Sequence, residues 1–251
     1  MFAIDLFGYA VMSNHYHIVL QLEPSRTDGW SDEDIVDRWM SLRSPNSPDD
    51  QDIKAQQRFV LLQDTQRLKV LRERLGSLSW LMRFINEPLA RLANKEDDCK
   101  GRLWEGRFKS QRLLDEHAVL AAMVYVDLNP IRAGVTDDVS HPPHTSMNKR
   151  QIDPEQSQPM TALNGPYAPL PFTYTLADYL ELAEWTVATQ QHKRPSRPNR
   201  GPPQSAELWL HHYLPIPGCW QRAIGSFESL RDYAKTLGQV WIKTRSLHLR
   251  M

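Results

Sequence analysis

Residues 2–22 read FAIDLFGYAVMSNHYHIVLQL, and this stretch decides the fold that the sequence predicts. Two runs rich in β-branched, aromatic and aliphatic residues flank Ser13-Asn14, a dipeptide of residue types that are common in tight turns. The pattern predicts a β-hairpin. Its second strand carries His15 and His17, and because alternate side chains of a strand point to the same face, the two imidazoles are expected to lie on one side of the hairpin.

The composition changes after the hairpin. Residues 23–60 are rich in Pro, Ser, Gly and acidic residues, which predicts a polar insertion that forms a mobile loop with one short helix near 35–42. From 63 to 93 the apolar residues recur at helical spacing, so a helix is expected there, with interruptions at Gly76 and Pro88.

The middle of the chain predicts strand and then helix. The segment 101–114, GRLWEGRFKSQRLL, is expected to form one or two strands. A helix is expected to begin at Asp115 or Glu116 and to run through AVLAAMVYVDL, with Pro130 and Gly134 as its end.

Composition also predicts the domain boundaries. Residues 140–170 are dense in Pro, Ser, Asn, Gln and Thr without periodicity, which predicts a linker. It would separate a first domain at 1–139 from a mostly helical C-terminal extension at 171–251, with helix candidates at 175–190 and 226–246. The predicted fold class is α+β: an antiparallel sheet that carries the histidine pair on a central strand, with helices packed on it.

The charge balance excludes a uniformly basic nucleic-acid binder, because the chain has 30 basic and 30 acidic residues. The charge is nevertheless uneven. From Arg67 to Arg112 there are 12 Lys and Arg against 6 Asp and Glu, which is a net charge of +6. Such a surplus suits a groove for nucleic acid, and it is equally typical of a solvated helix face.

The sequence predicts a soluble, cytoplasmic protein with no membrane partner. No stretch approaches the roughly 20 apolar residues of a membrane-spanning helix, and the N-terminus lacks the pattern of a signal peptide. Cys99 and Cys219 lie far apart and show no CxxC or Cys/His ligand spacing, so neither a disulfide framework nor a zinc site is predicted.

Two motifs carry candidate chemistry. His15 and His17 on one face could hold a cation, but paired histidines also occur by chance, so a third ligand is needed. Tyr125 and Asn129 are four residues apart in a predicted helix, which puts a phenol and an amide oxygen on one face, whereas Asp127 points elsewhere. Taken alone, Tyr125 would be interpreted as a buried aromatic residue of a core helix that stops at Asn-Pro.

In combination, these motifs resemble a known family. MSNHYHIVL at 12–20, WEGRF at 104–108 and YVDLNPIRAGV at 125–135, in this order, resemble the HUH single-strand DNA transposases that use one catalytic tyrosine, most closely the REP-associated tyrosine transposases. The resemblance covers about residues 4–139. It implies an HUH, ferredoxin-like catalytic domain, followed here by the C-terminal extension.

The resemblance also implies roles for individual residues. His15 and His17 match the metal-binding pair, Tyr125 matches the nucleophile, and Asn129 occupies the position of a further polar metal ligand. Two imidazoles and an amide oxygen leave coordination positions open, which suits Mg²⁺ or Mn²⁺. A free tyrosine has a pKa near 10, so this nucleophile needs a base or a nearby positive charge. Its attack would give a 5′-phosphotyrosine and a free 3′-hydroxyl, with the bond energy conserved for rejoining the strand.

The partner that the resemblance implies is single-stranded or hairpin DNA. Aromatic and guanidinium side chains suit unpaired bases and phosphates. The residues expected to contact DNA are Trp104, Arg107, Phe108, Arg83, Lys109 and Arg112. The WEGRF segment could equally form an ordinary half-buried strand.

Several alternatives stay open at this point. Family members have a further strand and helix ahead of the strand that leads into the histidine pair, so that strand and helix are expected to be missing here, which would expose a sheet edge. The chain is therefore predicted to be an active transposase, or an inactive or domesticated relative that binds structured DNA without cutting it. A third hypothesis is a nuclease that activates water at the histidine pair, for which Tyr125 would be dispensable. The protein could act as a homodimer.

Overall fold

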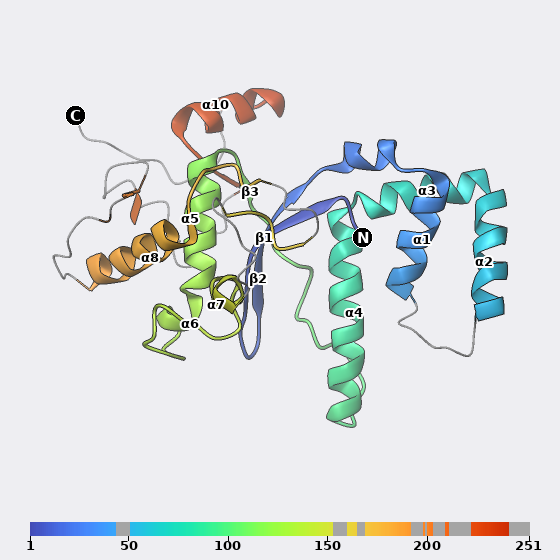
Figure 1. Cartoon of the computed structure of the whole chain (residues 1–251), viewed down its shortest axis with the longest axis horizontal. Helices are drawn as coiled ribbons and strands as arrows, with labels where there is room; N and C mark the ends of the chain where they lie inside the picture. Colours follow the sequence, from blue (N-terminus) through green and yellow to red (C-terminus); the bar gives the residue numbers. More distant parts are fainter. Residues whose placement is uncertain are drawn as a thin grey trace. The chain divides into compact units, whose positions relative to one another are not determined.

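The computed structural model describes residues 1–43, 51–152, 160–164, 169–191, 198, 200–202, 209–210 and 222–240. The chain divides into two compact units: unit 1 contains Met1–Asp5 and Gln21–Lys109, and unit 2 contains Leu6–Leu20 and Ser110–Met251. The fold class is α+β, as predicted, with helices in the majority and two small sheets in the described residues (Figure 1). No helix in these residues combines the length and the apolar character needed to cross a membrane.

The predicted hairpin is present. Strand β1 (Ile4–Val11) pairs with β2 (Tyr16–Leu22), and the Met12 N–H closes the turn by donating to the carbonyl of His15 at 2.9 Å. The expected central position of the histidine-bearing strand is not found in the described residues, where the sheet contains these two strands. β1 is the inner strand instead, because its other edge forms a bridge from Ala10 to Thr145.

Unit 1 is largely helical where a mobile loop was expected. Its elements are the 3-10 helix η1 (Pro24–Gly29) and the helices α1 (Asp32–Arg43), α2 (Gln51–Gln63), α3 (Thr65–Leu75) and α4 (Leu78–Glu96). Three of the acidic residues that suggested a loop, Asp32, Glu33 and Asp34, lie in the first turn of α1, where negative charge complements the helix dipole. Helix α1 packs against α2 and α3 (Figure 1), and the buried core there consists of Ile35, Val36, Trp39, Leu68, Leu71 and Leu75.

Only one of the two predicted helix interruptions is found. Gly76 separates α3 from α4, and a Cβ atom at this position would lie 3.2 Å from the backbone of Pro24, so the glycine also permits close packing of η1. Pro88 lies inside α4 and does not end it. A proline removes one backbone hydrogen bond from a helix, and here the surrounding turns continue on both sides.

Unit 2 is built around α5 (Glu116–Asp127), whose N-cap is Asp115 as predicted. The expected strands over 101–114 reduce to β3 (Arg112–Leu113), which pairs in parallel with β4 (Ala223–Ile224). Further elements are α6 (Asn129–Arg132), α7 (Ser146–Ile152), α8 (Leu176–Gln190) and α10 (Phe227–Thr236). α5 packs its apolar residues against Phe7, Val19, Tyr179 and Leu182, so the hairpin and α8 share one core with it (Figure 1).

The end of α5 differs from the prediction. The helix ends at Asp127, and Asn129-Pro130 begins α6 rather than terminating α5. Proline is favoured in a first helical turn because its missing N–H has no intrahelical acceptor there. Gly134 then leaves the helical conformation with a φ of 67°, in the region that glycine adopts most readily.

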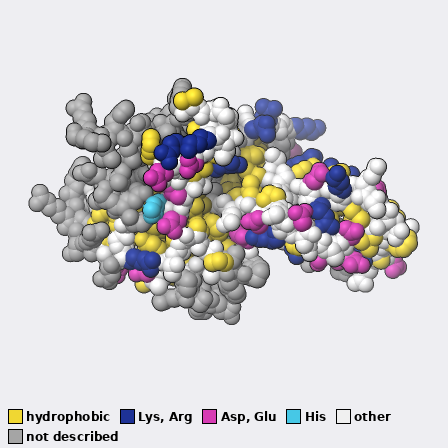
Figure 2. Space-filling view, turned by 90° about the horizontal axis from the view of Figure 1, so that it is seen from above, with side chains coloured by type: hydrophobic (Ala, Val, Ile, Leu, Met, Phe, Trp, Pro, Cys, Tyr) yellow, Lys and Arg dark blue, Asp and Glu magenta, His cyan; other side chains and the backbone are white. Residues whose placement is uncertain are grey.

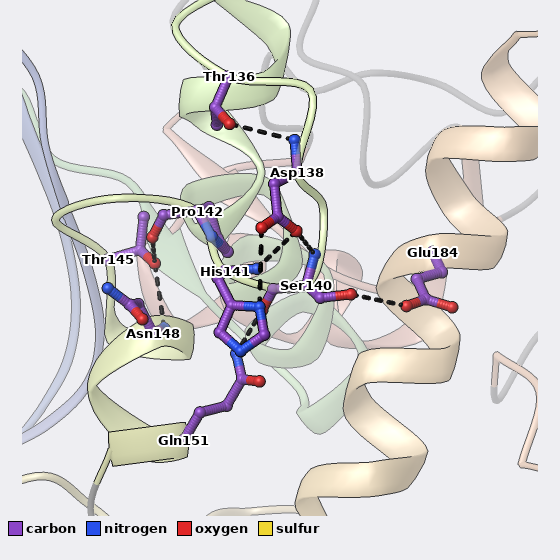
Figure 3. Close-up of polar contacts among 9 residues, drawn as sticks. All are labelled: Thr136, Asp138, Ser140, His141, Pro142, Thr145, Asn148, Gln151 and Glu184. Carbon is purple, nitrogen blue, oxygen red and sulfur yellow. Dashed lines mark hydrogen bonds and ion pairs between the residues drawn. The ribbon is translucent and has the colours of Figure 1, made fainter.

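The first part of the segment expected to be a linker, up to residue 152, is tied into unit 2. Asp138 accepts the N–H groups of Ser140 at 2.9 Å and His141 at 3.1 Å, and the Ser140 hydroxyl donates to Glu184 of α8 at 3.1 Å (Figure 3). Further along, Met147 is fully buried in the core. Polar composition suggested a spacer, but these polar side chains form the turns that connect α6 to α7.

The two helices expected in the C-terminal extension are found. α8 begins at a capping box in which the Thr175 hydroxyl accepts the Asp178 N–H and the Asp178 carboxylate accepts the Thr175 N–H. α10 ends at Thr236, and residues 237–240 are not helical, so the predicted helix is shorter than expected. The last part of that prediction, 241–246, lies outside the described residues, as does Cys219. Cys99 is an exposed free thiol.

Candidate functional site

The two histidines come from the turn end of β2. His15 immediately precedes the strand and is exposed, whereas His17 is its second residue and is half-buried. Their ring centroids lie 5.0 Å apart, with the ring planes 85° to one another. The two-residue spacing therefore places both imidazoles together at the same end of the hairpin.

Tyr125 and Arg132 meet the histidine pair in unit 2. The ring of Tyr125, from α5, lies edge-on to His17 with 5.8 Å between the ring centroids. The guanidinium carbon of Arg132, the last residue of α6, lies 4.3 Å from the centroid of the Tyr125 ring. We call His15, His17, Tyr125 and Arg132 the histidine–tyrosine cluster. It joins residues 15–17 to residues 125–132, which are more than a hundred positions apart.

The electrostatics of the cluster favour a neutral imidazole at His17. Burial lowers the pKa of His17 to about 4, and the nearby His15 and the positive charge of Arg132 act in the same direction. A neutral imidazole is the form that binds a metal ion. The Nδ1 of His15 lies 2.6 Å from the Asn14 side-chain oxygen, so Nδ1 is the donor in this contact and Nε2 is the ring nitrogen that would bind a metal ion.

The residues of the cluster fit a divalent metal ion with an open coordination sphere. An imidazole nitrogen lies about 2.0–2.1 Å from a bound metal such as zinc, so two rings at this separation can share one ion. Within the described ranges, no group of three or more His, Cys, Asp or Glu residues could hold a metal. Further ligands would therefore be amide, water or phosphate oxygens, as in sites that keep positions open for a substrate.

Asn129 is the amide-bearing residue that the sequence predicted as a ligand. It is buried and is the first residue of α6. Because α5 ends at Asp127, Tyr125 and Asn129 are not four residues apart in one continuous helix, as the prediction assumed. Helical spacing therefore does not place Asn129 beside the histidines.

No protein-family model matches the chain, and neither a curated protein nor a solved structure matches it.

Asp127 is the residue that sequence reasoning left without a role. It lies two positions from Tyr125 and is fully buried. Its carboxylate accepts hydrogen bonds from the Ser146 hydroxyl at 2.6 Å, the Met147 N–H at 2.9 Å and the Tyr179 hydroxyl at 2.7 Å. Burial raises the pKa of Asp127, while these donors act in the opposite direction. An acidic residue inside the otherwise apolar run of α5 was the available signal for such a network.

The network continues from Asp127 to β1. Ser146 accepts the Tyr9 N–H at 3.0 Å, and the buried Arg150 donates to the carbonyl oxygen of Phe7 at 2.8 Å. These contacts connect α5 and α7 to the hairpin. Since His17 is on the hairpin and Tyr125 on α5, the buried network holds the two elements from which the histidine–tyrosine cluster is built.

The residues predicted to contact DNA are distributed over both units. Arg83, Trp104, Arg107, Phe108 and Lys109 belong to unit 1, and Arg112 belongs to unit 2. The WEGRF segment forms no strand, so the half-buried strand considered as its alternative is not found. Its Trp104 is half-buried and donates its indole N–H to the Asn86 carbonyl at 3.1 Å.

The charged residues near this segment are partly neutralised. Arg83 pairs with Glu87 at 3.1 Å, and Glu87 also pairs with Arg91, both as exposed contacts along α4. On the face drawn in Figure 2, Lys and Arg side chains are interspersed with Asp and Glu side chains. Arg107 and Lys109 are exposed, and the Arg112 guanidinium lies 5.0 Å from the ring centroid of Tyr233. Part of the net positive charge counted in the sequence is thus paired with acidic side chains.

Proposed function

We propose that this chain is a metal-dependent enzyme that cleaves and rejoins single-stranded DNA through a tyrosine nucleophile, with an HUH-type catalytic domain. The observation that carries the proposal is the meeting of Tyr125 with the histidine pair, in which 5.8 Å separates its ring from that of His17 and 5.0 Å separates the two imidazoles. A phenol beside two imidazoles that could hold a metal ion is a combination that suits phosphodiester transfer. The resemblance of the three sequence motifs to REP-associated tyrosine transposases supports the same reaction.

The proposed step is a transesterification at phosphorus. A bond forms between the Tyr125 phenol oxygen and the phosphorus, and the bond from phosphorus to the 3′ oxygen breaks. The phenol gives up its proton and the departing 3′ oxygen gains one, so atoms and charge balance without an oxidant or a nucleotide cofactor. The 5′ end of the break stays on the tyrosine, and the reverse step rejoins a 3′-hydroxyl to it.

The remaining residues would hold the ion and the strand. His15 and His17 would bind Mg²⁺ or Mn²⁺, with Asn129 as a further ligand, and Mn²⁺ tolerates nitrogen ligands better. When bound, such an ion neutralises the charge that builds on the phosphate. The exposed Arg107, Lys109 and Arg112 would contribute phosphate contacts. Arg83 could exchange its partner Glu87 for a phosphate, because exposed ion pairs are weak. Trp104 and Phe108 offer aromatic surface for bases.

The test is a search for a covalent protein–DNA adduct. The full chain is incubated with a library of single-stranded hairpin oligonucleotides and Mg²⁺ or Mn²⁺, and adducts are detected on a denaturing gel. The wild type is expected to form one that Tyr125→Phe does not form. Tyr16→Phe is the matched control. Tyr16 lies between the two histidines in the sequence, and because successive side chains of a strand point to opposite faces, its loss should not affect the adduct yield.

The other outcomes separate the alternatives. Hairpin binding without an adduct in the wild type would contradict the proposal and would indicate a domesticated relative that binds structured DNA. Cleavage that persists in Tyr125→Phe and stops on chelation would instead show a nuclease that activates water at the histidine pair.

A further inference from the structure

Arg132 is the member of the histidine–tyrosine cluster that neither the motif spacing nor the family resemblance assigned a role. It is exposed, it is the last residue of α6, and its guanidinium carbon lies 4.3 Å from the centroid of the Tyr125 ring. An arginine in this place can do one of two things. It can hold the aromatic ring by a cation–π contact, or it can bind the phosphate that the phenol attacks.

The geometry favours the phosphate. The phenol oxygen is at the edge of the ring that Arg132 covers, and a nucleophile must come within about 3–3.5 Å of the atom it attacks. A phosphorus in that position lies within reach of the arginine side chain. The guanidinium is also permanently charged, and its forked N–H donors match two oxygens of one phosphate.

We infer that Arg132 binds the scissile phosphate and stabilises the negative charge that builds on it while Tyr125 attacks. The inference rests on the proposed strand transfer and adds to it a second source of positive charge beside the metal ion. Arg132 would exchange no proton in the step, because a guanidinium stays protonated throughout. Its fork would release the two oxygens only when the strand leaves.

The first experiment compares rates of adduct formation in the full chain. Arg132→Gln is expected to slow the reaction about a hundredfold, as does the loss of one donor to a developing oxyanion, while hairpin affinity changes little. Arg132→Lys should recover part of the rate, because it restores the charge without the fork. Arg231→Gln is the control, since this exposed arginine of the same unit lies on α10 beside Asp232.

A methylphosphonate at the cleaved position separates phosphate binding from ring positioning. The methyl group replaces a charged oxygen, so there is less charge for Arg132 to stabilise. Wild type and Arg132→Gln should then react at nearly equal rates. If the hundredfold difference persists on this substrate, Arg132 only positions the tyrosine ring and the inference is wrong.

A binding measurement tests the inference without requiring cleavage of DNA. In the Tyr125→Phe protein, an oligothymidylate of about ten nucleotides with a 5′-phosphate should bind about tenfold more tightly than its 5′-hydroxyl form, through one charge-assisted contact. Adding Arg132→Gln should remove that preference. If the wild type forms no adduct but the preference depends on Arg132, the proposed function fails and the phosphate site stands. An adduct that forms equally well without Arg132 would overturn the phosphate site and leave the proposed function intact.

Discussion

Tyr125 and Asp127 lie two residues apart on α5, but their side chains have different environments. Tyr125 is half-buried and faces His17 and Arg132, which are groups with chemistry to offer a substrate. Asp127 is fully buried and its carboxylate is occupied by three donors, two from α7 and one from α8. The first face of the helix is partly exposed, and the second is closed by the protein itself.

Because of this difference, one side of α5 is expected to matter for binding and chemistry and the other for stability. Buried polar groups must be satisfied because leaving one without a partner costs about 1–3 kcal/mol, and more for a charged group. A half-buried group at a site can exchange its partners when a substrate arrives. Substitutions on the Asp127 side should therefore affect unfolding, and substitutions on the Tyr125 side should affect binding and chemistry.

Removal of the Asp127 carboxylate should have the largest effect on stability. In Asp127→Ala the Ser146 hydroxyl, the Tyr179 hydroxyl and the Met147 N–H all lose their acceptor in the core. We expect the free energy of unfolding to fall by about 3–5 kcal/mol, as when one partner of a buried charged network is removed. Urea denaturation followed by circular dichroism measures it.

The control for this change is Asp137→Ala, an exposed carboxylate on the loop after α6, which should change stability by about 0.5 kcal/mol or less. If Asp127→Ala does not fold, Asp127→Asn keeps one acceptor oxygen and allows the measurement. A loss below about 1 kcal/mol in both variants would remove the distinction between the two faces of α5.

The histidine pair provides the complementary test. His17→Ala should weaken Mn²⁺ binding by at least about tenfold, which is about 1.4 kcal/mol, because it removes one of two nitrogen ligands. Its effect on unfolding without metal should stay near 1 kcal/mol or below. Isothermal titration with Mn²⁺ measures the first quantity and urea denaturation the second.

His117→Ala is the matched control for metal binding, since this half-buried histidine lies at the start of α5 beside Glu116. It should bind Mn²⁺ like the wild type. Equal affinities in wild type, His15→Ala and His17→Ala would show that the pair is not a metal site, and the comparison of the two faces would then concern stability alone.

Local sequence signals predicted a large part of the fold. The turn at Ser13-Asn14, the helix start at Asp115 or Glu116 and the helical pattern of 175–190 each lie within or next to the element they define. Their effect can be read without knowing what lies nearby in space. The hairpin, α5 and α8 were therefore predictable.

Long-range contacts were not predictable in the same way. The partners of Asp127 are 19 to 52 positions away, and two of them lie in a segment whose composition indicated a linker. Polar residues that form buried networks and polar residues of a solvated spacer look alike in sequence. For the site, the spacing placed the histidine pair, but only the fold brings Arg132 onto the Tyr125 ring.

Asp115 stands at the N-terminal end of α5, and its pKa is shifted in the opposite direction from the pKa of Asp127. Asp115 accepts the Ala118 N–H at 2.9 Å, the Ser226 N–H at 2.6 Å and the Ser229 hydroxyl at 3.2 Å. Burial acts to raise the pKa of Asp115, but the hydrogen bonds from Ser226, Ala118 and Ser229 outweigh it and hold the pKa below its usual value. The folded state therefore favours the charged carboxylate at this end of the helix.

The sign of the pH dependence follows from that direction. A carboxylate whose pKa is lowered on folding contributes stability that is present above its unfolded pKa of about 3.9 and is lost as the pH falls through the folded pKa. Asp115→Asn should cost about 1 kcal/mol near pH 7, as for other helix caps, and the difference from wild type should shrink below about pH 4. Urea denaturation at several pH values, with Asp137→Asn as the exposed control, measures this. A difference that stays constant down to about pH 3 would mean that Asp115 acts by shape and not by charge, so that only the Asp127 end of α5 depends on a buried carboxylate.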